Sequence, residues 1–232
     1  MPRVSIIIPT YNHAKEIVKC LESIFKQTFQ NFEVVVVNDG STDNTLEVLE
    51  KYKDRIKIVN QENKGASAAR NRGAKEARGE YLLFCDADLV LKPKMLEKMV
   101  RVLDDNQGVS YVYSWFCFGW KAFRLWPFDE ERLKKMPYIH TSSLMRGKDF
   151  PGFDKKLKKF QDWNLWLTML ESGKKGALIP EILFKVRPRK LGMSQWLPKI
   201  FYKIPWKKFG LRIRALEEYE KAKAVIKEKH HL

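Results

Sequence analysis

Four short apolar runs limit the folds open to this chain. Each run is long enough for a buried strand, and each is followed by a polar turn and a stretch of helical or polar character. The runs are Val4 to Ile8, Val34 to Val37, Ile56 to Val59 and Tyr81 to Cys85. Strands that alternate with helices pair in parallel through right-handed crossovers. The pattern therefore predicts an α/β fold whose polar loops emerge at one edge of the sheet.

The loops after these runs carry side chains that suit a nucleotide. An aromatic ring can stack on a base, a carboxylate can accept a hydrogen bond from it, and cations can bind phosphates. The residues concerned are Tyr11, Asp39, Lys64, Arg70, Asp86 and Asp88. Each has an ordinary alternative: Tyr11 as a core edge, Asp39 as a turn residue before glycine, Arg70 as a solvated helix charge. Their occurrence at successive strand ends favours a binding site.

Asp86 and Asp88 flank one small residue directly after the last apolar run. At the end of a strand both carboxylates can face one point, in the region where open α/β sheets bind ligands. Because close carboxylates repel each other, we expect a divalent cation, Mn²⁺ or Mg²⁺, shared with substrate phosphates. The structural alternative is a loop whose aspartates only cap the helix after Pro93.

The alternation ends beyond residue 105. Val109 to Trp120 lies in the longest uncharged stretch and predicts a strand of a mixed sheet, whereas Trp163 to Leu170 predicts a helix. Asp162 lies directly before that helix, where a carboxylate suits the N-cap position.

Four motifs occur in a familiar order and spacing: Pro9-Thr10-Tyr11-Asn12, Asn38 to Asp43, Asn63-Lys64-Gly65 through Arg70-Asn71 to Gly73, and Asp86-Ala87-Asp88. Together they resemble the nucleotide-sugar half of family 2 glycosyltransferases with the GT-A fold, a Rossmann-like, mostly parallel mixed sheet flanked by helices. The resemblance covers roughly residues 3 to 190. It implies a metal at Asp86 and Asp88. It also implies a nucleotide-sugar donor held by Pro9, Tyr11, Asn12, Asp39, Lys64, Arg70 and Asp86.

The resemblance assigns the catalytic base as well. In that family an aspartate in a Glu-Asp or Gln-Asp motif before an aromatic-rich helix takes the proton of the acceptor hydroxyl, and here that aspartate is Asp162. The implied reaction is direct displacement with inversion and needs no protein nucleophile. A UDP-sugar donor is favoured over a GDP-sugar, and the acceptor is expected to be a saccharide or a lipid-linked precursor.

The chain departs from the family near residue 190. Many members have an Arg-x-His segment there, whose histidine faces the diphosphate, but this chain has none. We expect Arg187 or Arg189 to supply the phosphate cation instead. His140 precedes Thr141-Ser142 and has two interpretations, a place near the acceptor or a structural role; for a lone histidine the structural role is favoured.

Positive charge is concentrated at the end of the chain. The net charge is +16, and residues 185 to 229 hold 14 basic residues against four glutamates. We expect a catalytic domain at 1–194, with a nucleotide-sugar half (1–105) and an acceptor half (106–194), and a basic, aromatic extension at 195–232. Residues 195–210 suit either an anionic membrane surface or packing on the domain, and Leu216 to Lys229 suits a solvated helix.

The same charge is also compatible with a different function class. A basic protein that binds nucleic acid or membrane through the tail would explain the +16, but it leaves the acidic loops unexplained, so no nucleic acid is expected. Three scattered cysteines favour buried thiols in a reducing compartment. With no signal peptide or membrane span in view, we expect a cytoplasmic protein, free or peripheral at the inner face of the membrane.

Overall fold

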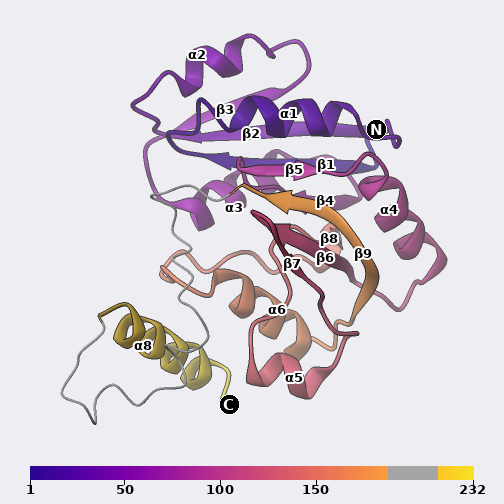
Figure 1. Cartoon of the computed structure of the whole chain (residues 1–232), viewed down its shortest axis with the longest axis vertical. Helices are drawn as coiled ribbons and strands as arrows, with labels where there is room; N and C mark the ends of the chain where they lie inside the picture. Colours follow the sequence, from indigo (N-terminus) through magenta and orange to yellow (C-terminus); the bar gives the residue numbers. More distant parts are fainter. Residues whose placement is uncertain (188–213) are drawn as a thin grey trace.

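The computed structural model describes residues 1–187 and 214–232. Its first half is a parallel sheet with helical crossovers, as predicted (Figure 1). The strands are β1 Val4–Thr10, β2 Phe32–Asp39, β3 Lys57–Gln61 and β4 Tyr81–Phe84. The connecting helices are α1 Ile17–Phe25, α2 Thr45–Glu50 and α3 Ala66–Glu76. β1 lies between β2 and β4, and β3 pairs with β2.

The second half extends the same sheet in mixed directions. Its strands are β5 Leu89–Leu91, β6 Tyr111–Phe118, β7 Lys121–Phe123, β8 Leu144–Arg146 and β9 Gly176–Val186. Its helices are α4 Met95–Asp105, α5 Glu130–Lys135, the 3-10 helix Gly147–Asp149 and α6 Gln161–Glu171. The strand order over the described residues is β3-β2-β1-β4-β8-β6-β9-β5, with β7 paired to β6. Because β8 is antiparallel to both β4 and β6, the strands β1 to β4, β6 and β9 all end at one edge.

Two strand boundaries differ from the sequence prediction. The first strand extends beyond the predicted run, which ends at Ile8, and continues to Thr10. Pro9 is tolerated there because only β2 still pairs with β1 at that position, since the pairing with β4 stops at Ile7. The predicted strand over 109–120 ends earlier, because Gly119, at a φ of +60°, turns the chain back into β7.

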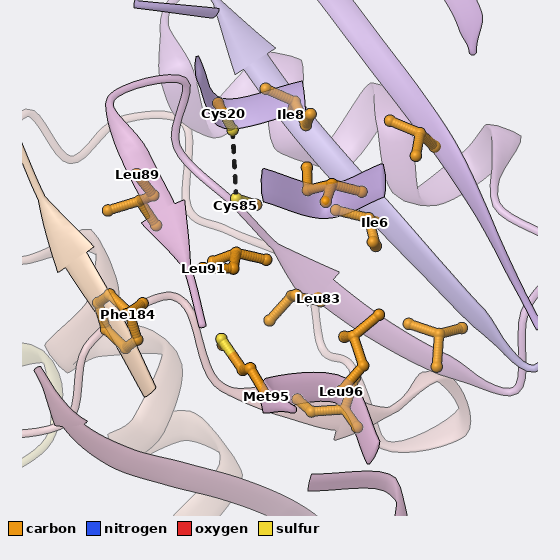
Figure 2. Packing of buried hydrophobic residues seen from close by; sticks show 14 of the residues in the cluster. Ile6, Ile8, Cys20, Leu83, Cys85, Leu89, Leu91, Met95, Leu96 and Phe184 are labelled. Carbon is orange, nitrogen blue, oxygen red and sulfur yellow. Dashed lines mark hydrogen bonds between the residues drawn. The ribbon is translucent and has the colours of Figure 1, made fainter. Parts of the chain in front are cut away.

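One face of the sheet packs against α1 and α4 (Figure 2). Ile6 and Ile8 of β1 are fully buried there, and so are Cys20 of α1 and Cys85 at the end of β4. The two sulfur atoms lie 3.7 Å apart. Both thiols are free and buried, as predicted, whereas Cys117 is only half-buried.

The other face packs against α6 and, through it, α8 Arg214–Lys229 (Figure 1). Ile226 of α8 is fully buried in the cluster that contains Trp163 and Trp166 of α6. His230, just after α8, is buried and bonds Glu171 at 2.7 Å and Asn164 at 3.1 Å. The prediction of a solvated helix is therefore wrong for the face that carries Ile226. A helix with charges on most sides can still bury one apolar stripe.

Residues 195–210, expected either at an anionic membrane surface or packed on the domain, lie outside the described residues, as does the 194/195 domain boundary. Within residues 1–187 and 214–232, every helix is too short or too polar to traverse a bilayer.

Candidate active site

Asn12 ties the loop after β1 to the loop after β2. Its side-chain oxygen accepts hydrogen bonds from the backbone N–H groups of Thr42 (2.8 Å) and Asp43 (3.3 Å), and its own N–H donates to Ser41 Oγ (3.0 Å). Asn12 adopts a φ of +55°, a left-handed conformation that asparagine tolerates better than most residues. Tyr11, next to this anchor, keeps 41% of its surface exposed, so its ring is available to stack on a base.

Asp39, at the end of β2, organises the loop after β3. Only 3% of its surface is exposed. Its carboxylate accepts from the backbone N–H groups of Lys64 (2.9 Å) and Gly65 (2.8 Å) and from Gln61 Nε2 (2.7 Å). The Lys64 side chain is exposed and lies 3.7 Å from Glu62. These three bonds hold the Asp39 carboxylate in place. Since a carboxylate has about four lone-pair sites, one remains for a further donor such as a base N–H.

Arg70 connects the Asp86-Ala87-Asp88 motif to the Gln161-Asp162 motif. Its guanidinium is nearly buried and donates to Asp86 Oδ1 at 2.7 Å and to Gln161 Oε1 at 2.9 Å. It also lies over the ring of Phe153, 5.3 Å from the centroid. Burial opposes ionisation of Asp86, but the charge and hydrogen bond of Arg70 hold its pKa below the usual value. Arg70 is therefore a fixed cation, not a solvated helix charge.

Asp88 lies at the same edge, in the turn between β4 and β5. Its carbonyl accepts from the backbone N–H of Arg187, the last residue before the undescribed segment, at 3.0 Å. Arg187 has an exposed side chain, and Arg189 lies outside the described residues. Pro9 is buried within β1.

The carboxylate pair fits a divalent cation shared with a substrate. One oxygen of Asp86 is bonded by Arg70, so a cation would be held by its other oxygen together with Asp88. In the described ranges no cluster of three His, Cys, Asp or Glu side chains could form a complete protein cage. Mg²⁺ and Mn²⁺ with one or two carboxylates commonly complete their coordination with phosphates and water.

Asp162 lies in the first turn of α6, one residue after the Arg70 partner Gln161. It is not the N-cap, because α6 begins at Gln161 and Phe160 occupies the cap position with a φ of +58°. Asp162 Oδ1 accepts from the N–H of Trp163 at 2.8 Å. Burial raises the pKa of Asp162, against the lowering effect of His140 and Arg70. A carboxylate with a raised pKa is better suited to accept a proton.

His140 belongs to the site, although sequence reasoning treated it as structural. Burial lowers the pKa of His140, and the nearby carboxylates of Asp86 and Asp162 oppose that lowering. Its Nδ1 accepts from the N–H of Ser142 at 3.0 Å, which leaves Nε2 to carry the proton of the neutral ring. Its ring packs at 5.0 Å from those of Phe116 and Phe184. Only the neighbouring Thr141-Ser142 in the sequence hinted at this place.

Known proteins are similar in sequence to this chain. The model of the family Glycosyl transferase family 2 matches residues 5–166. The putative glycosyltransferase EpsE of Bacillus subtilis is 31% identical over 203 residues, which are 80% of this chain and 73% of EpsE. The uncharacterized glycosyltransferase MJ1057 of Methanocaldococcus jannaschii is 29% identical over 80% of this chain and 71% of its own length.

Solved structures share the fold. S. aureus TarS 1-349 in complex with UDP is 25% identical, with a TM-score of 0.69 over 81% of this chain and 61% of that one. The mannosyltransferase PcManGT from Pyrobaculum calidifontis, in complex with GDP-Man and Mn²⁺, is 22% identical, with a TM-score of 0.66 over 83% of this chain and 59% of that one. This chain therefore spans less than two thirds of either solved chain. The family match covers most of the residues that form the sheet and the site, and the chain belongs to glycosyltransferase family 2.

Proposed function

We propose that this chain is an inverting glycosyltransferase that moves a sugar from a nucleoside diphosphate sugar, with UDP as the favoured nucleotide, to an acceptor hydroxyl. The observation that carries the proposal is the Arg70 bridge. One buried guanidinium bonds Asp86 of the donor motif and Gln161, the neighbour of Asp162. The groups that would hold the departing diphosphate and the group that would deprotonate the acceptor are thereby adjacent.

The donor side is built from the three loops after β1, β2 and β3. The ring of Tyr11 stacks on the base, and the carboxylate of Asp39 accepts the base N–H. TarS, at 25% identity, was crystallised with UDP, which supports the choice of nucleotide. A bound Mn²⁺ or Mg²⁺ at Asp86 and Asp88 supplies charge stabilisation for the departing diphosphate.

The acceptor side is built around Asp162. Its carboxylate accepts the proton of the attacking hydroxyl, and the anomeric centre inverts because the hydroxyl attacks opposite the leaving group. Arg70 remains paired with Asp86 throughout, and the exposed side chain of Arg187 supplies a further cation toward the phosphates. The acceptor is a saccharide, either free or carried on a lipid.

Calorimetry of nucleotide binding tests this function. UDP and GDP are titrated with and without Mn²⁺ into the wild type, Asp88→Ala and the control Asp54→Ala, which changes an exposed aspartate away from the motifs. We expect UDP to bind the wild type and Asp54→Ala with Mn²⁺, and to bind Asp88→Ala at least tenfold more weakly. If neither nucleotide binds the wild type, the proposed function is wrong.

A further inference from the structure

We propose that the hairpin of β6 and β7 binds the saccharide acceptor through the indole ring of Trp120. The inference rests on the proposed transferase function, because it concerns the second substrate of that reaction. Trp120 occupies the hairpin tip, and 94% of its surface is exposed. By contrast, Trp163 and Trp166 are fully buried. This ring lies at the edge of the sheet that carries the site, where it is open to a ligand.

The backbone turn that carries this ring is held in place. Gly119 makes the turn, and its N–H donates to the carbonyl of Val186 on β9 at 3.0 Å. Below the tip, the ring of Phe116 on β6 is parallel to those of Phe123 on β7, at 5.0 Å, and Phe184 on β9, at 5.3 Å. A ligand that meets an anchored turn loses less binding free energy to ordering the protein backbone.

The tip lies within reach of the reacting groups. Asp88 accepts the N–H of Arg187, and the adjacent Val186 accepts the N–H of Gly119. Two strand spacings of about 4.8 Å therefore separate the backbone of Asp88 from that of Gly119, roughly 10 Å in all. An acceptor whose reacting hydroxyl lies beside Asp162 and the donor would extend its neighbouring sugar units across these strand ends toward the tip. Trp120 is thus positioned for a sugar next to the reacting one.

The chemistry of the tip favours a sugar over a lipid surface. The face of a pyranose presents C–H groups with partial positive charge, and the face of an indole is electronegative. From 118 to 124, the exposed residues besides Trp120 are Ala122 and Arg124, so the tip offers one ring and not a broad apolar face. Insertion into a membrane interface requires a wider apolar surface. Lys185 and Arg187, exposed on the adjacent strand, would also accommodate an acceptor that carries acidic groups.

Calorimetric titration with chitotriose, cellotriose and mannotriose tests the proposal, with and without UDP and Mn²⁺. The proteins are the wild type, Trp120→Ala, Trp120→Phe and the control Trp126→Ala, an exposed tryptophan of the same segment that is not on the hairpin. We expect at least one trisaccharide to bind the wild type and Trp126→Ala. Trp120→Ala should weaken that binding roughly tenfold, whereas Trp120→Phe keeps most of it. Melting temperature and UDP affinity should be the same in the Trp120 variants and the wild type.

Two results would overturn the inference: no binding of any of the three trisaccharides to the wild type, or equal binding to the wild type and Trp120→Ala. Sedimentation with phosphatidylserine vesicles addresses the lipid alternative. If Trp120→Ala loses vesicle binding but keeps trisaccharide binding, the tip is a membrane contact and the inference fails. A different result would contradict the proposed transferase function: a wild type that binds neither UDP nor GDP.

Discussion

Replacing Ile226 with alanine tests whether α8 is an integral part of the folded domain. The Ile226 side chain is fully buried in the cluster that contains Trp163 and Trp166. Truncation of a buried isoleucine to alanine costs about 2–5 kcal/mol, from lost transfer free energy and the remaining cavity. Because α8 lies at the surface and can shift toward the cavity, we expect the lower part of that range, about 2–3 kcal/mol. For a chain of this size the melting temperature should fall by roughly 5–10 °C.

The neighbouring residue provides the control. Val225 is 50% exposed, so Val225→Ala should change the free energy of unfolding by less than about 0.5 kcal/mol. Both substitutions introduce alanine, a strong helix former, so intrinsic helix propensity does not account for a loss. Urea denaturation followed by tryptophan fluorescence measures both variants. If Ile226→Ala and Val225→Ala unfold at the same urea concentration, α8 does not pack on the domain and the structural reasoning is wrong.

Three further predictions concern the site. Asp162→Asn should abolish transfer yet raise the melting temperature at pH 7. Burial raises the pKa of Asp162 in the native state, so the native state keeps the proton to a higher pH than the unfolded chain does. The wild type therefore loses stability as the pH rises through that pKa. Melts at pH 7 and pH 3 should show this difference only at pH 7, and a less stable variant at pH 7 would contradict it. The transfer rate of the wild type should rise with pH through the same raised pKa, so a pH–rate profile whose acid limb lies at or below about 4, the ordinary aspartate value, would contradict the role of Asp162 as base. Arg70→Met should cost about 3 kcal/mol of stability, because it leaves Asp86 without its cation. The control Arg72→Met, at an exposed position of the same helix, should cost little. Equal urea midpoints for the two variants would refute the importance of the bridge.

The sequence predicted the sheet and its loops for a clear physical reason. Runs such as Val34 to Val37 are apolar without interruption, a pattern typical of strands buried on both faces, and β2 contains that run. The motif aspartates follow directly from these strands, so their common edge could also be predicted. The end of β6 at Phe118 was missed, since a single glycine turn inside an uncharged stretch gives only a weak signal.

Contacts between distant residues could not be predicted in this way. The burial of Ile226 depends on α6, about sixty positions earlier, and neither composition nor periodicity reports such a partner. The place of His140 beside Asp86 and Asp162 likewise arises from three separate segments. Even Arg70, which was predicted to be in the site, required the structure to reveal Gln161 as its second partner. The assigned roles of the site residues stay predictions until the binding and kinetic measurements above.

The hydrogen bonds of Asn12 and Asp39 have a consequence for protein engineering. Asn12 fastens the loop after β1 to Thr42, and Asp39 fastens the loop after β2 to Lys64 and Gly65. A graft of one loop from a relative would break its bonds to the neighbouring loop, whatever contacts it brought to the nucleotide. Exchange of nucleotide preference between family members should therefore succeed when all three loops are transplanted as a set, and yield poorly folded chimeras when they are moved singly.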